Sequence, residues 1–148
     1  MLGNERGDRG PCTLARNAVA SANNVRGNRN DARFLPQNAI DGNRDTYWAT
    51  DDSVHTPELI LDFGRDVTFS VVRLREYLPL GQRVEGFALD RWQDGRWVEF
   101  ASATSIGNCR LVRGKPQTTS RIRLRITRAA VCPAISEWSL FLEKPSAN

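Results

Sequence analysis

The chain has few of the residues from which metal and redox sites are built. Its 148 residues include one histidine and three cysteines, and their spacing forms no zinc-binding pattern. Three cysteines are also too few for a disulfide framework. Cys109 and Cys132 lie on segments that could be neighbours, whereas Cys12 lies in a polar N-terminal stretch. One disulfide bridge therefore remains possible, although buried or free thiols without a role are the simpler expectation.

Signals for membrane insertion and for catalysis are absent as well. No run approaches the roughly 20 apolar residues that a membrane helix needs. The opening MLGNERGDRGPC is polar and charged, so it is not a signal peptide and fits a domain cut from a longer polypeptide. No GxSxG elbow or triad is present. The carboxylates of Asp51 and Asp52 would face opposite sides of a strand, which is poor geometry for glycosidase chemistry. We therefore expect a non-catalytic domain.

The positive charge is spread along the chain. The net charge is +4, which by itself would allow nucleic acid or an anionic membrane as partner. In the segment RIRLRI, however, Ile122, Leu124 and Ile126 alternate with arginines, which is typical of a strand with one buried face and one solvated face. The basic residues are not interleaved with aromatic ones as in RNA-binding surfaces. We do not expect nucleic acid as a partner.

Short alternating segments separated by Gly, Pro and Asn predict an all-β fold, an antiparallel β-sandwich. The length suits one domain. We place a leader or linker at residues 1–13, the domain at 14–143 and a tail at 144–148. The expected strands are residues 14–22, 58–63, 68–77, 84–92, 96–101, 109–113, 121–127 and 137–143. Gln93-Asp94-Gly95 has the chemistry of a hairpin turn.

The stretch at residues 38–50, NAIDGNRDTYWAT, has the composition of a cation-binding loop. It brings Asp41, Asn43 and Thr46 together around Gly42, which can turn sharply without a Cβ penalty. Calcium prefers about six to eight oxygen ligands, and backbone carbonyls count among them. A plain Asx-rich surface turn that leads into a strand is the alternative. Trp48 follows the loop and is expected to anchor it in the core.

The same stretch resembles the signature loop of discoidin domains, also called coagulation factor V/VIII type C domains, which include carbohydrate-binding module family 32. The closing segment ISEWSLFLE at residues 135–143 resembles the last strand of that family. The run VVRLREYLPLGQRVEGFALDRWQDGRWVEFA resembles the C-terminal accessory domain of family 29 glycoside hydrolases, the α-L-fucosidases. The resemblance covers residues 14–142 and implies a galactose-binding-like jelly roll.

The resemblance also implies a structural calcium ion that ties the loop to the last strand. When the ligands of the family are matched to this sequence by position, they are backbone and side-chain oxygens of six residues: Asn38, Asp41, Asn43, Thr46, Ser136 and Glu137. This set supplies two carboxylates and about seven oxygens, which suits calcium better than magnesium.

A sugar site is expected in the loops at one end of the sandwich, as in family 32 modules. Two positions depart from that family: Ala49 follows Trp48 where a histidine is common, and the usual arginine position falls near Arg75 and Glu76. The candidate ligands are therefore other polar and aromatic loop residues: Asn23, Asn24, Asp51, Asp52, His55, Glu76, Tyr77 and Arg83.

These expectations combine into a calcium-containing module that binds galactose- or fucose-containing glycans and accompanies a glycoside hydrolase. The alternative is a structural accessory domain whose LREYLPLGQR segment packs on the catalytic domain of an α-L-fucosidase, without a sugar site of its own. A third interpretation is discoidin-like adhesion through exposed Phe34 and Leu35. The expected partners are carbohydrate and a catalytic domain of the same polypeptide, not a membrane. We expect a monomer that is secreted, periplasmic or on the cell surface.

Overall fold

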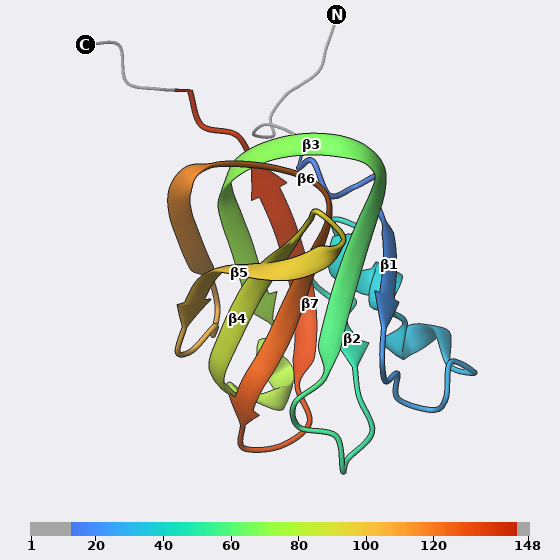
Figure 1. The fold of residues 1–148 in the computed structure, drawn as a ribbon. Helices are drawn as coiled ribbons and strands as arrows, with labels where there is room; N and C mark the ends of the chain where they lie inside the picture. Colours follow the sequence, from blue (N-terminus) through green and yellow to red (C-terminus); the bar gives the residue numbers. More distant parts are fainter. Residues whose placement is uncertain (1–12, 145–148) are drawn as a thin grey trace, which may run out of the picture.

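A computed structural model describes residues 13–144 as a β-sandwich (Figure 1). All strand pairs are antiparallel, in the order β2-β7-β3-β6-β4-β5, and β1 pairs with β3. The strands are β1 (Val19–Ala22), β2 (Trp48–Ala49), β3 (Glu58–Glu76), β4 (Val84–Gln93), β5 (Arg96–Ala103), β6 (Arg110–Ala129) and β7 (Ala134–Phe141). Three short 3-10 helices lie between them: η1 (Ala32–Phe34), η2 (Pro36–Ile40) and η3 (Leu78–Leu80). The predicted all-β sandwich is therefore confirmed.

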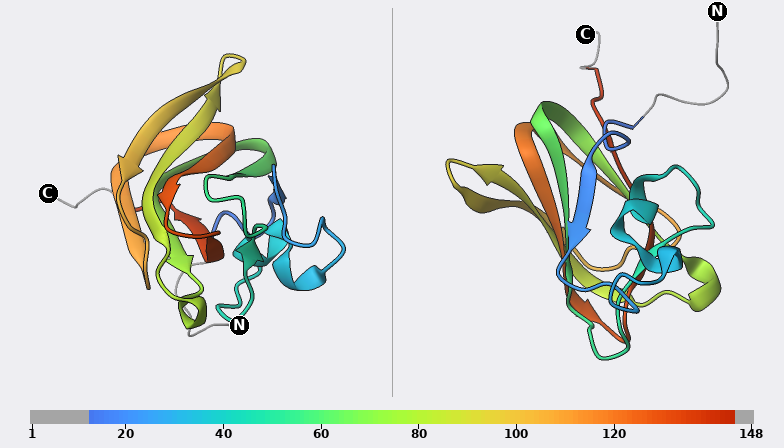
Figure 2. Two further views of the ribbon diagram at one scale, coloured as in Figure 1. Left: turned by 90° about the horizontal axis from the view of Figure 1, so that it is seen from below. Right: turned by 90° about the vertical axis from the view of Figure 1, so that its right-hand side faces the viewer.

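Two long strands, β3 and β6, run through both layers of the sandwich. The first part of β3 pairs with β1 and with the end of β6, at Ile60↔Arg123 for example. The second part pairs with β7 and with the start of β6, at Val72↔Leu140 and Val72↔Val112. The register breaks between Asp62 and Val67, where β3 arches over the top of the sandwich (Figures 1 and 2). The two layers are thus continuous through the backbone.

The core lies between the layers and takes one face of each strand. Ile122, Leu124 and Ile126 are buried within it, as their alternation predicts. The indoles of Trp48 and Trp138 are fully buried, so the predicted core position of Trp48 is confirmed. The arginines of the same strand do not simply extend into solvent, as residues on a solvated face would. Arg123 and Arg125 both donate to Asp90 Oδ2 at 2.7 Å, and the Asp90 side chain is 2% exposed.

Several predicted boundaries are wrong. Residues 14–18 form turns, so the first strand begins only at Val19. Gly64 was expected to end a strand, but β3 continues through it because its φ of +71° lets the backbone bend without losing the strand. Likewise β6 is continuous from Arg110 to Ala129. The hairpin turn is confirmed, with positive φ at Asp94 and Gly95.

Cys109 and Cys132 do not form the bridge that the sequence left open. Cys109 is exposed and Cys132 is buried, and both thiols are free. Cys12 and most of the predicted leader lie outside the described residues, as does the end of the predicted tail. In residues 13–144 no helix is long and apolar enough to cross a membrane.

Candidate functional site

Four loops meet at one end of the sandwich and enclose a cavity of about 370 Å³. They are the segment after β1, the β2–β3 connection, the η3 region and the β6–β7 connection. The cavity is lined by two arginines, one acid, two aromatic rings and small or aliphatic residues: Arg26, Phe34, Tyr47, Ala49, Asp52, Leu80, Arg83, Val131 and Cys132. This volume lies within the range of small-ligand pockets, roughly 300–1,000 Å³.

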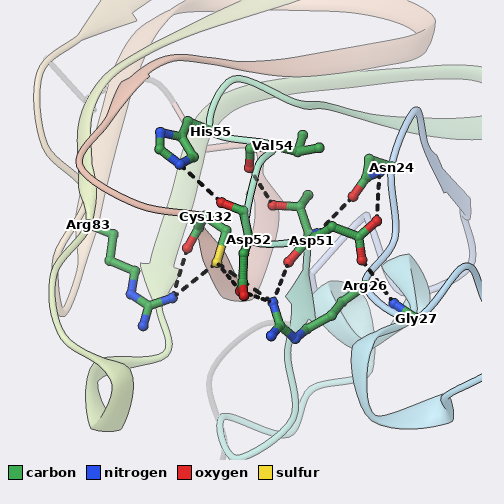
Figure 3. Close-up of polar contacts among 10 residues, drawn as sticks. Asn24, Arg26, Gly27, Asp51, Asp52, Val54, His55, Arg83 and Cys132 are labelled. Carbon is green, nitrogen blue, oxygen red and sulfur yellow. Dashed lines mark hydrogen bonds and ion pairs between the residues drawn. The ribbon is translucent and has the colours of Figure 1, made fainter.

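Arg26 is fixed at the cavity wall by one of its nitrogens. Its Nη1 donates to Asp52 Oδ1 at 2.7 Å and to the carbonyl of Thr50 at 3.1 Å (Figure 3). The hydrogen bond from Arg26 lowers the pKa of Asp52, and the same bond raises that of Arg26. Its Nε and Nη2 have no partner among residues 13–144. These two nitrogens remain available for a ligand.

Arg83 approaches from the opposite side of the opening, as Figure 3 shows. Its Nη1 donates to the carbonyl of Cys132 at 2.8 Å, and its Nε donates to the carbonyl of Leu80 at 3.2 Å. These bonds tie the η3 region to the β6–β7 connection. The thiol of Cys132 lies between the two guanidiniums, 3.9 Å from Nη1 of Arg26 and 3.6 Å from Nη1 of Arg83. Both arginines are therefore held in place before any ligand arrives.

An aromatic cluster forms the wall beside Arg26. Tyr47 stacks on Tyr77 with ring centroids 4.2 Å apart and an interplanar angle of 17°, and it contacts Phe34 at 5.8 Å. Arg26 lies over the Phe34 ring at 5.9 Å. Phe34 and Leu35 are partly buried and pack against the core. The interpretation that Phe34 and Leu35 are exposed apolar side chains for adhesion is therefore wrong, because both side chains pack within the domain.

The structure brings some of the predicted sugar ligands together at this end. Asn24 and Asp51 form two hydrogen bonds: Asn24 Nδ2 donates to Asp51 Oδ2 at 3.2 Å, and the backbone N–H of Asp51 donates to Asn24 Oδ1 at 2.9 Å. His55 is exposed, and its Nε2 lies 3.1 Å from the carbonyl of Asp52 (Figure 3). Asp51 also accepts from the backbone of Gly27. These contacts shape the loops, and of the eight candidates only Asp52 and Arg83 line the cavity.

Glu76 does not lie at the opening where the sequence placed it. Its side chain is buried, and it accepts three backbone hydrogen bonds: from Arg83 at 2.8 Å, Val84 at 3.0 Å and Gly107 at 2.8 Å. A buried carboxylate with this many donors is structural. Asn23 has a similar role, because its Oδ1 accepts from the backbone of Glu58 at 2.9 Å. Tyr77 supports Tyr47 from behind.

The predicted sugar ligands left out seven of the nine lining residues, among them the cavity's remaining charged and aromatic side chains, Arg26, Phe34 and Tyr47. A signal existed for Tyr47, because Trp48 is in the core and neighbouring strand residues face opposite ways. Arg26 and Phe34 belong to a long polar loop, a kind of segment that often binds ligands. Nothing in the sequence, however, indicates that this loop and the Arg83 segment reach the same cavity.

The loop half of the predicted calcium site brings several oxygens close together. The hydroxyl of Thr46 lies 2.5 Å from Asp41 Oδ2, 2.9 Å from the carbonyl of Asn43 and 3.4 Å from that of Asn38. Asp41 Oδ1 accepts from the backbone of Asn43. Four oxygens thus converge on one place, as a hard cation needs. The loop residues fit calcium.

The strand half does not fit equally well. The Glu137 carboxylate accepts from Nε of Arg73 at 2.8 Å, from Nε of Arg75 at 2.6 Å and from the Ser139 hydroxyl at 2.5 Å. Burial alone would raise the pKa of Glu137, but these hydrogen bonds outweigh it and hold that pKa below its usual range. Both carboxylate oxygens are therefore engaged by protein groups. Ser136 is buried beside this strand end, and its hydroxyl points toward the carbonyls of Arg75 and Glu76.

Within residues 13–144, no three His, Cys, Asp or Glu side chains gather into a metal-binding group. The predicted calcium shell contains only two carboxylates, so this finding does not decide the calcium prediction.

The arrangement defines a β-sandwich module with a ligand-sized cavity in its end loops. A comparison with protein families matches residues 17–140 to the F5/8 type C domain. The chain belongs to this family, and it is accordingly a non-catalytic module. Family 29 glycoside hydrolases and family 32 carbohydrate-binding modules are among its structural relatives.

Individual relatives agree with this assignment. "Alpha-L-fucosidase 1" of Arabidopsis thaliana is 33% identical over 91% of this chain, which spans 27% of that protein. The crystal structure of SpGH29 is 34% identical, with a TM-score of 0.79, over 89% of this chain and 28% of its own length. The family 32 module of NanJ from C. perfringens, solved with galactose, is 17% identical, with a TM-score of 0.75, over 87% of this chain and 97% of its own. That last likeness concerns the fold alone. The chain spans about a quarter of the fucosidase relatives.

Proposed function

We propose that this domain binds a neutral glycan in the cavity at the loop end. One observation carries the proposal. Two guanidiniums that are already held in place, those of Arg26 and Arg83, line the same cavity of about 370 Å³ as the Tyr47 ring. Planar guanidinium groups can donate to two adjacent hydroxyls, and an aromatic face packs on the apolar C–H face of a pyranose. Asp52, whose side chain is 85% exposed, adds an acceptor. Together these groups suit a sugar.

The glycan would be galactosyl or fucosyl, and the module would accompany a glycoside hydrolase. Support comes from the fucosidase relatives, of which this chain matches about a quarter. A binding module raises the effective concentration of a tethered catalytic domain near its substrate, and it does so even with a weak site. The contribution of this domain to hydrolysis would then be proximity, with the chemistry in another domain.

A glycan-array screen followed by calorimetric titration tests this proposal. Tyr47→Ala removes the ring that faces the sugar and should weaken binding of an array-identified galactosyl or fucosyl glycan about tenfold or more. His55→Ala is the matched control, because His55 belongs to the same loops but does not line the cavity. Equal losses in both variants, with both proteins folded, would contradict the assignment of the cavity.

The second candidate is a structural accessory domain, and one observation favours it. Leu78 and Leu80 of η3 are 40% and 41% exposed, and they belong to the segment that was predicted to pack on a catalytic domain. Large exposed aliphatic side chains that lie close together often mark an interface. A blank array from a folded protein would select this function over the first.

We also propose that calcium binds the loop at residues 38–46 weakly. The loop offers one carboxylate, that of Asp41, together with the hydroxyl and carbonyl oxygens around Thr46. Glu137 would have to leave Arg73 and Arg75 to join them. Calcium binds more weakly when fewer charged ligands surround it, and this loop supplies one. The ion would brace the loop and take no part in sugar chemistry.

A further inference from the structure

A second hollow lies away from the loop-end cavity, on the outer face of the layer formed by β7, β3 and β6. Its volume is about 760 Å³. Cross-strand rows build its floor: Val71 lies between Phe141 and Arg113, and Arg73 lies between Ser139 and Leu111. Its walls come from the segment before β1 and from the loop around Gly42. We call it the arginine groove, after its five lining arginines: Arg16, Arg44, Arg73, Arg75 and Arg113.

The groove has a local excess of positive charge. Five arginines and two glutamates, Glu137 and Glu143, line it, which gives a local net charge of +3. Glu137 is shared by two guanidiniums, and Arg113 meets Glu143 at 3.3 Å on the exposed rim. The guanidinium of Arg44 has a neutral contact, to the Asn108 side-chain oxygen at 3.4 Å. An anion in this groove would therefore meet guanidiniums that are not fully neutralised.

In one wall of the groove, Arg16 lies against a glycine. Gly42 has φ of +78°, a backbone conformation that favours glycine, and a Cβ built on it would lie 2.5 Å from Nη1 of Arg16. The Arg16 guanidinium therefore packs closely on the loop at Gly42, where it lines the groove.

The floor also offers apolar surface. The Arg73 guanidinium lies 4.8 Å from the centre of the Phe141 ring. Leu111 is 42% exposed and Leu142 is 52% exposed, and both line the groove. Apolar patches beside guanidinium forks suit a molecule that has both an apolar face and an anionic group. A sugar ring that bears a carboxylate or a sulfate has both.

We propose that the arginine groove is a binding site for an acidic saccharide, separate from the neutral-glycan cavity. Guanidiniums of Arg44, Arg113 and Arg16 take the anionic groups, and the Phe141–Leu111 floor packs against the sugar ring. Two sites with different preferences on one module would let it hold mixed neutral and acidic polysaccharides. The proposal does not depend on the function of the loop-end cavity.

The test measures calorimetric binding of the whole chain to polygalacturonate and to its fully methyl-esterified form, which keeps the backbone and removes the charge. We expect binding to polygalacturonate that weakens as salt rises, and at least tenfold weaker binding to the ester. Chondroitin sulfate and unsulfated chondroitin, which share a backbone and its carboxylates, separate the two anionic groups: tighter binding to the sulfated form would add sulfate to the groups that the groove takes, and equal binding would assign the site to carboxylate.

Charge-matched variants test the location. Arg44→Gln with Arg113→Gln removes two charges from the groove, and Arg65→Gln with Arg96→Gln removes two exposed charges elsewhere. The first pair should lose affinity for polygalacturonate about tenfold or more, and the second should lose less than about threefold. Equal losses would show general attraction to a basic protein and overturn the site. No binding by the folded chain, or equal binding to the ester, would also overturn it. Tyr47→Ala should bind polygalacturonate as well as the unchanged protein, so failure of the loop-end proposal is distinguishable.

Discussion

Replacing the Glu76 carboxylate with an amide should destabilise the domain. In the structure, Oε1 accepts from the backbone of Arg83 and Val84, and Oε2 accepts from that of Gly107. Glu76 and Gly107 also bond through their main chains, with N to O at 2.9 Å. One side chain therefore joins the end of β3, the start of β4 and the β5–β6 connection.

Glu76→Gln keeps the shape and removes one acceptor. The amide oxygen can serve either Arg83 and Val84 or Gly107, and the NH₂ group must then face a backbone N–H. A buried donor left without a partner costs about 1–3 kcal/mol, and the remaining bonds lose their charge assistance. We expect a loss of about 2–4 kcal/mol in the free energy of unfolding. For a domain of this size that corresponds to a fall in Tm of about 6–12 °C.

Urea unfolding followed by tryptophan fluorescence measures this loss, because Trp48 and Trp138 are fully buried. Glu85→Gln is the control: Glu85 lies in β4 directly after Val84 and is exposed, and within residues 13–144 its carboxylate pairs with Arg128 alone, at 3.1 Å. That change should stay within about 0.5 kcal/mol. Equal midpoints for the two variants, combined with lost glycan binding in Glu76→Gln, would refute the structural role and return Glu76 to the sugar site.

Three further outcomes are expected. Arg125 and Arg123 outweigh the effect of burial and hold the pKa of Asp90 below its usual range, and hydrogen bonds do the same for Glu137. The stabilisation from both acids is therefore complete above the ordinary carboxyl pKa of about 4, and it is lost as pH falls through the lower folded-state pKa values. Between pH 6 and pH 2, the Tm of Asp90→Asn should fall less steeply than that of the unchanged protein. Parallel curves of Tm against pH would contradict this. Because Glu137 is engaged by arginines, Tm should rise by less than about 2 °C between chelator and 0.1 mM calcium, and a rise of many degrees, absent in Glu137→Gln, would instead indicate the full seven-oxygen shell. In a Cys12→Ser background, Ellman's reagent should modify exposed Cys109 quickly and buried Cys132 only on unfolding; two fast thiols would show that the loop end opens.

The sequence predicts best where a local pattern has one physical solution. Alternation in RIRLRI places Ile122 and Leu124 in the core, and Asp94-Gly95 can adopt the positive φ values of a tight hairpin turn. Alternation also predicts that Arg123 and Arg125 leave the core. It cannot reveal their partner, because Asp90 is reached only through the register of β4 on β6.

The sequence does not show the partners of a side chain when they lie far away along the chain. Glu76 reads as a loop-end polar residue, yet the bulge between Arg75 and Glu76 turns it inward onto backbone donors. Glu137 matches a calcium ligand by position, yet Arg73 and Arg75 face it across the strand pair. The donors to these two carboxylates lie 7 to 64 residues away, except Ser139, which is two residues from Glu137. Matching a motif identifies a candidate residue, but it does not show which groups contact that residue in the folded domain.

The continuity of β3 and β6 has a consequence for how the domain is made. A ribosome completes β3 long before it completes either of the main partners, since Val72 pairs with Val112 and with Leu140. Until then, β1 is the one strand already made that pairs with β3, so one edge of its first part and both edges of its second part lack partners in the nascent chain. Closure comes last, when Leu14 donates to the carbonyl of Leu140 at 2.9 Å. Because nearly all of these pairings join distant residues, folding is expected to be slow, in milliseconds to seconds, and to begin only when almost the whole domain has left the exit tunnel.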